Sequence, residues 1–335
     1  MAAEVVSFTE EEQEIIGWFK SLSNWGRWGA DDEAGTLNLI TDEVRVKGAR
    51  AVRHGVPVAC AWELTPGVQP ADFSPFPRMQ RYMIHSGQGQ KDAHRVHKYE
   101  TPFDGCLEYV GIVFHGWNVT HLDSLCHCFW DGMMYNGRPA ELVTELEGAT
   151  CHAVTAAQDG ITTRGVLLDV AAARGVKWLE PGEGVRPEDL IAAEERQGVK
   201  VESGDALLVR TGYGRRKREI PTDPTKDGPM SCCGATQGAP GPHVSLTPWL
   251  HERGVSLFAS DTGNELYPSG LTPYLEHAFH AVSQVTMGMW LLDNCDLEAL
   301  GAKCAELNQY DFLFSAPPLM ITGGTGSPVT PVALL

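Results

Sequence analysis

The stretch that decides the fold is Phe114-His115-Gly116-Trp117-Asn118-Val119-Thr120-His121-Leu122-Asp123-Ser124-Leu125-Cys126-His127. It places three histidines and one aspartate close together. His121 and Asp123 are two residues apart, so on a β-strand their side chains point to the same face. An imidazole beside a carboxylate suits a divalent cation such as zinc or manganese. His115 has the same parity as His121, and His127 follows a point where the chain could turn back over the site.

An isolated His-x-Asp pair is more often a hydrogen-bonded structural pair than a metal site. Two further histidines within so few residues favour a metal or catalytic site instead. We expect His127 to act as a proton carrier, with a further ligand as the alternative.

The pattern Thr120-His121-x-Asp123-x-x-x-His127 resembles the core of the metal-dependent cyclase family, which includes bacterial kynurenine formamidase and isatin hydrolase. The family motif is His-x-Gly-Thr-His-x-Asp-x-Pro-x-His. The resemblance implies that His121 and Asp123 bind a divalent metal, zinc or manganese. The chain departs from the motif at three positions, which are Trp117 for the first His, Val119 for Gly and Leu125 for Pro.

Trp117 is the departure with the largest consequence, because an indole cannot bind a metal. On a regular strand His115 would lie roughly 20 Å from His121, so it could join the site only through a bend, which Gly116 could permit. Two versions of the site stay open. We favour a single metal without His115, in which Trp117 forms an apolar wall over the substrate, and the alternative includes His115 as a ligand.

The second half of the site is expected in the last third of the chain. His277 and His280 are three apart and would share a helix face. Asp293 follows an apolar, strand-like run. In the resembled family a helical His and an acidic residue about a dozen positions later both bind metal, which implies His280 and Asp293. The alternative is that Asp293 caps a helix over 296–305.

Composition bounds the remaining possibilities. The 335 residues are 43% apolar and 21% charged, which is ordinary for a globular protein with a full core. A net charge of −17 argues against nucleic acids and anionic membranes as partners. The sequence shows no apolar run long enough to span a bilayer, no secretory signal and no cysteine framework among its nine scattered cysteines. We therefore expect reduced thiols and a cytoplasmic location.

Local patterns predict alternating strands and helices. Thr9 and Glu12 form a capping box for a helix to about Ser21. A second helix is expected from Thr41. Further helices are predicted over 187–197 and up to 253, and strands over 56–63, 164–170, 204–212 and 255–260. Residues 66–104 form a long excursion, either a flap near the site or a subunit contact, and 214–242 a surface loop. This order favours an α/β fold with a mixed sheet.

The resemblance implies a more specific fold and function. The fold would be a swivelling β/β/α fold around a mixed, barrel-like central sheet. We expect a single domain over 1–335 with an N-terminal helical and loop extension over about 1–50, assembled as a dimer or tetramer. The function would be metal-dependent hydrolysis of a small cyclic or N-acyl amide, in which metal-activated water attacks the carbonyl. The alternatives are a cyclase or dehydratase of secondary metabolism, and a metal-free binding protein.

Overall fold

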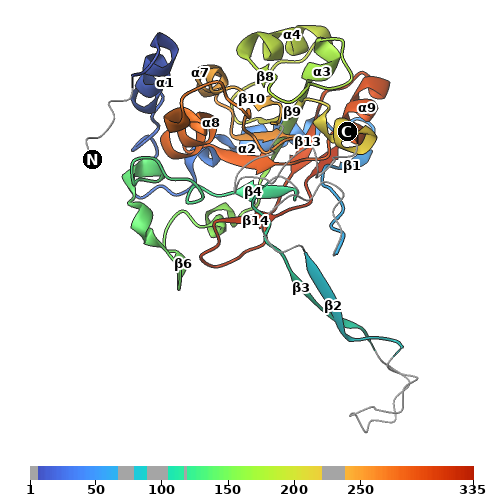
Figure 1. The fold of residues 1–335 in the computed structure, drawn as a ribbon. Coiled ribbons are helices and arrows are strands. Elements are labelled where there is room, and N and C mark those ends of the chain that lie inside the picture. The colour runs from blue at the N-terminus through green and yellow to red at the C-terminus, as the bar shows by residue number, and fades with distance from the viewer. Residues whose placement is uncertain (1–6, 67–78, 89–104, 117–118, 221–237) are drawn as a thin grey trace.

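The computed structural model describes residues 7–66, 79–88, 105–116, 119–220 and 238–335 (Figure 1). A nine-stranded mixed sheet, curled into a half-barrel, forms its centre. In spatial order the strands are β1 (Pro57–Ala59), β15 (Val332–Leu334), β13 (Asp311–Ser315), β7 (Thr162–Asp169), β9 (Ala206–Arg210), β11 (Leu257–Ser260), β12 (Trp290–Asp293), β4 (His121–Asp123) and β14 (Gly326–Pro328).

Four neighbouring strands, β7, β9, β11 and β12, run parallel, and antiparallel strands flank them on both sides. The parallel strands are buried on both faces, as expected of parallel sheets. Along β7, Val166 and Leu168 enter one hydrophobic core while Leu167 enters a second core on the opposite face. Period-2 alternation therefore divides the interior into two apolar layers.

Helices cover the sheet (Figure 1). They are α1 (Glu10–Ser21), α2 (Asp42–Arg50), α3 (Val170–Ala173), α4 (Pro187–Gln197), α5 (Tyr213–Glu219), α7 (Thr247–Arg253), α8 (Ala278–His280) with its π-helical continuation η7 (Ala281–Thr286), and α9 (Glu298–Leu307). Short 3₁₀ turns are η1 (Gly35–Leu39), η2 (Tyr135–Gly137), η3 (Ala140–Leu142), η4 (Val154–Ala157), η5 (Val244–Leu246) and η6 (Pro273–Leu275). None of the helices in the described ranges combines the length and apolar character that crossing a bilayer requires.

Three small two-stranded sheets stand apart from the central one. They are β2 (Gln80–His85) with β3 (Leu107–Gly111), β5 (Val143–Thr144) with β6 (Gly148–Ala149), and β8 (Gly184–Val185) with β10 (Gly241–Pro242). The β2–β3 hairpin extends far beyond the rest of the ribbon (Figure 1). Strand β2 lies within the predicted excursion over 66–104, and β3 follows it. Residues 67–78 and 89–104 of that excursion lie outside the described residues.

Several sequence predictions are confirmed, and others need correction. The capping box at Thr9 is present, and α4 has the predicted bounds. The strand expected over 56–63 is only Pro57–Ala59, because its partner β15 is three residues long and follows Pro331. The predicted surface loop over 214–242 begins instead with α5, where Arg and Lys favour helix and Gly212 supplies a left-handed entry with φ 77°.

The seven cysteines in the described ranges are free thiols. Cys232 and Cys233 lie outside those ranges.

Candidate metal centre

Strand β4 carries the first two residues of the site. It pairs with β12 so that His121 lies opposite Asp293 and Asp123 lies opposite Leu291. His121, Asp123 and Asp293 therefore project from one face of this strand pair, and all three are buried. Asp293 is the last residue of β12, and α9 begins only at Glu298 with Leu297 at its N-cap, so the alternative of a capping role for Asp293 is wrong.

Asp123 lies at the centre of four imidazoles. Its Oδ1 is 2.9 Å from His115 Nδ1 and 3.3 Å from His121 Nε2. Its Oδ2 is 3.7 Å from His127 Nε2 and 4.0 Å from His280 Nε2. None of these contacts has the alignment of a hydrogen bond, so both carboxylate oxygens are buried without a donor.

His115 enters the site through a bend. Gly116 has φ 120°, a conformation that favours glycine, and regular strand structure is confined to His121–Asp123. The His115 ring stacks on His127 with centroids 4.0 Å apart and lies 5.1 Å from the His121 ring. On a regular strand His115 and His121 would lie roughly 20 Å apart. The chain instead bends at Gly116, and His115 reaches the site as the alternative with a bend requires. His115 Nε2 also lies 3.0 Å from Thr325 Oγ1, which fixes the ring.

His127 reaches Asp123 after a tight turn, in which its backbone N–H donates to Ser124 O at 3.0 Å. Burial and the imidazoles of His115, His280 and His121 lower the pKa of His127 to about 3, although the Asp123 carboxylate opposes them. His127 is therefore a neutral imidazole near neutral pH. The cavity also gives it access to bound molecules.

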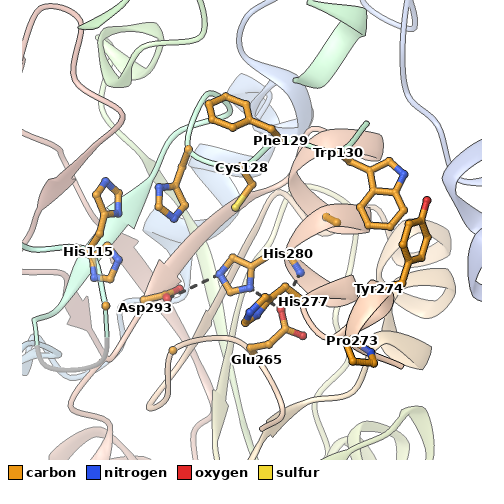
Figure 2. A pocket seen from close by; sticks show the side chains of 15 residues that line it. His115, Cys128, Phe129, Trp130, Glu265, Pro273, Tyr274, His277, His280 and Asp293 are labelled. Carbon is orange, nitrogen blue, oxygen red and sulfur yellow. Dashed lines mark hydrogen bonds and ion pairs between the residues drawn. The ribbon is translucent and has the colours of Figure 1, made fainter. Parts of the chain in front are cut away.

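His280 is held by Glu265, a residue that the sequence analysis missed. Glu265 Oε2 lies 2.8 Å from His280 Nδ1 and accepts from the His280 backbone N–H, while Oε1 accepts from Phe279 N–H. His280 Nε2 consequently faces the carboxylates, 3.9 Å from Asp293 Oδ2 (Figure 2). His277 is not helical as predicted, because α8 begins at Ala278, but its side chain lines the same cavity.

Glu265 and Asn264 follow β11 at the carboxyl end of a parallel strand, the sheet edge where ligand-binding loops gather in α/β proteins. Asn264 Nδ2 donates to Asp293 Oδ1 at 2.6 Å. The position after a buried strand was the only sequence signal for these residues.

Two groups of side chains could hold metal ions, and Asp123 belongs to both. One is His115, Asp123 and His127, and the other is His121, Asp123 and Asp293, with ligand atoms within 4.8 Å of one another in each group. Burial and the nearby Asp123 carboxylate raise the pKa of Asp293 to about 7. A divalent cation would offset this repulsion and satisfy the oxygens of Asp123, so the donor set fits such an ion. Whether these residues bind metal remains a prediction.

A cavity of about 590 Å³ opens onto these residues. Aromatic side chains form much of one wall, namely Phe129, Trp130 and Tyr274 (Figure 2). Trp130 and Tyr274 meet edge to face at 5.2 Å, and Phe19 stacks behind Trp130 at 4.2 Å. Trp117, predicted as an apolar wall, lies outside the described residues.

One protein family has a sequence model that matches this chain. The family model described as "Putative cyclase" matches residues 62–264, more than half of the chain. No curated protein sequence matches the chain.

Solved structures share the fold. A crystal structure described as a novel cyclase is 27% identical, covers 95% of this chain and 99% of its own, and gives a TM-score of 0.82. Isatin hydrolase A from Ralstonia solanacearum is 19% identical over 88% of this chain and 97% of its own, with a TM-score of 0.56. Isatin hydrolase A from Labrenzia aggregata is 18% identical over 86% of this chain and 96% of its own, with a TM-score of 0.54. On the family match, the chain belongs to the cyclase family.

Proposed function

We propose that this protein is a metal-dependent hydrolase of a small cyclic or N-acyl amide. The observation that carries the proposal is Asp123, whose two buried oxygens have no hydrogen-bond donor and are surrounded by four imidazoles. A buried carboxylate whose oxygens have no hydrogen-bond donor is costly, so this arrangement favours a bound cation over a purely structural cluster. Family membership and the fold shared with structures named isatin hydrolase support the reaction class.

The residues of the site divide into those that would bind the metal and those that would transfer a proton or contact the substrate. His121, Asp123, Asp293 and His115 would hold the cation, with His280 as a further ligand. His121 Nδ1 lies 2.8 Å from Val119 O, so its Nε2 faces the site. A divalent cation, zinc or manganese, would polarise a carbonyl and lower the pKa of water at this position.

His127 would carry the proton. As a neutral imidazole it can accept a proton from the attacking water and then return it to the leaving nitrogen. Phe129, Trp130 and Tyr274 would exclude water from one side of the cavity and bind the apolar part of the substrate. The limited cavity volume supports a small molecule.

The test begins with protein stripped of metal by a chelator and reloaded with zinc or manganese. Matched pairs of a lactam and its ring-opened acid, and of a formanilide and its amine, would be followed by chromatography. We expect hydrolysis of at least one amide only after reloading. Activity that survives chelation, or no activity on any amide in the reloaded protein, would contradict the proposal.

A further inference from the structure

Asn294 directly follows β12, and its side chain is fully buried. Its Nδ2 donates to Gly116 O at 2.6 Å and to Val119 O at 3.3 Å. A single amide group therefore contacts the backbone next to His115 and the backbone two residues before His121.

Two features of this position favour asparagine. The backbone of Asn294 is left-handed, with φ 54°, a conformation that asparagine adopts more readily than most residues other than glycine. Its side chain faces two carbonyl oxygens, and only the NH₂ end of the amide can donate to both. The other end, Oδ1, is buried and has no hydrogen-bond partner among the described residues. Reversing the amide would turn this oxygen toward Gly116 O and Val119 O, so the two acceptors fix its orientation.

The backbone of Asn294 joins two further segments around the site. Its N–H donates to Thr262 O at 2.7 Å, in the segment after β11 that also carries Asn264 and Glu265. Its carbonyl oxygen accepts from Thr120 Oγ1 at 2.7 Å. One residue thus connects the end of β12, the segment after β11 and the chain that leads into β4.

The side-chain contacts of Asn294 bear on the positions of two imidazoles. Val119 O, one of its acceptors, also lies 2.8 Å from His121 Nδ1. Gly116, the other acceptor, has φ 120° and is the point where the chain bends to bring His115 into the site. A glycine backbone can adopt many other conformations, so the hydrogen bond from Asn294 helps to select this one.

We propose that Asn294 is a positioning residue for the imidazoles of His115 and His121. It holds both rings toward the carboxylate of Asp123 through the two backbone carbonyl groups that it binds. Asn294 is not among the described residues that line the cavity, so it acts without contacting a bound ion or substrate. The inference rests on the proposed metal centre, but the positions of the rings can be measured without metal.

Labelling of the metal-free protein with diethyl pyrocarbonate tests the position of His115, and mass spectrometry of peptides gives the rate at each histidine. Asn294→Gly keeps the left-handed backbone and removes the amide, so His115 should react several-fold faster than in the wild type. Asn308→Gly is the matched control and should leave this rate unchanged. Asn308 is also left-handed, with φ 48°, but is exposed at the end of α9.

A second histidine separates a local effect from a loss of the fold. Buried His243 should remain slow to react in every folded variant. If Asn294→Gly does not fold, Asn294→Asp provides the same test, because it keeps the size of the side chain and turns an oxygen toward the two carbonyl oxygens. An unchanged rate at His115 in the folded variant, or an equal increase at His243, would overturn the proposal.

Zinc affinity, measured by competition with a chromogenic chelator, tests whether the effect passes through His115. Asn294→Gly should lower the affinity about tenfold or more, as for other residues that orient a ligand. The same substitution should have a smaller effect in the His115→Ala background, where one of the two rings is gone. Equal fold-losses in both backgrounds would overturn the proposal. A wild type that binds no zinc would contradict the proposed function instead, and the labelling of His115 would then decide the role of Asn294.

Discussion

Asp123 shares a buried site with a second carboxylate, Asp293, and the two would repel without compensating charge. The pKa values of two of the surrounding histidines shift in opposite directions. The pKa of His121 rises to about 9, because the attraction of Asp123 and Asp293 exceeds the effect of its desolvation. The pKa of His127 falls, because desolvation and neighbouring imidazoles prevail. The carboxylates around His121 thus favour positive charge at its Nε2, where a bound cation would take the place of the proton, whereas His127 stays a neutral imidazole. In the proposed site His121 is therefore a metal ligand and His127 the proton carrier.

Replacing His127 should separate these roles. His127→Ala is expected to retain its metal and lose on the order of 10²- to 10⁴-fold in turnover, the usual contribution of a general base. His121→Ala should instead lose metal affinity by about tenfold or more, since its Nε2 is fixed toward the carboxylates. Metal analysis and steady-state kinetics on both variants provide the measurement. Equal metal loss in the two would reassign His127 as a ligand.

Glu265 is predicted to position His280. In Glu265→Gln the side-chain carbonyl can still accept from a backbone N–H, but the charged partner of His280 Nδ1 is removed. Metal affinity should fall about 10- to 100-fold, as for other residues that orient a ligand. Glu276→Gln is a suitable control, because Glu276 binds Ser269 in the neighbouring loop. Isothermal titration giving the same affinity for both variants would refute the role.

At the scale of elements, the capping box of α1 also connects that helix to the cavity wall. Glu12 accepts from Thr9 N–H at 2.9 Å and from Thr272 N–H at 2.7 Å, next to Pro273 and Tyr274. These two backbone hydrogen bonds lower the pKa of Glu12 from 4.5 to about 2. A carboxylate with a lowered pKa stabilises the fold above pH 4.5 and loses this contribution as the pH falls towards 2.

Glu12→Gln should therefore lower the melting temperature at neutral pH. The difference between wild type and variant should shrink as the pH falls from 4.5 towards 2. Glu10→Gln, in the same first turn, serves as the control. Melting curves across this pH range measure the effect, and a difference that does not change with pH would show that Glu12 acts without its charge.

The predictable elements are those whose pattern is local. Apolar runs identified β7, β9 and β11, and Pro187 with a left-handed Gly198 after Gln197 bounds α4. The bend at Gly116 was not predictable with the same certainty, because one backbone angle decides whether His115 joins His121. Strand β2 lies within the stretch over 66–104, which shows no clear periodicity, so the sequence did not predict it.

At the scale of the whole molecule, the site is assembled from distant segments. The sequence spacing identified His121 with Asp123, and the family resemblance identified His280 with Asp293. Glu265 could not be connected to His280 from the sequence, because only the packing of α8 against the loop after β11 brings them together. The mixed sheet explains this assembly, since β4 and β12 are neighbours although about 170 residues separate them along the chain.

The metal content of Asp123→Asn tests the central claim most directly. Elemental analysis would compare wild type, Asp123→Asn and the control Asp42→Asn, an exposed aspartate in the first turn of α2, after equal loading with zinc or manganese. We predict bound divalent metal in the wild type and the control, and at least about a tenfold loss in Asp123→Asn, because Asp123 belongs to both candidate metal groups. Full metal retention in Asp123→Asn, or a wild type that binds no divalent metal, would contradict the account.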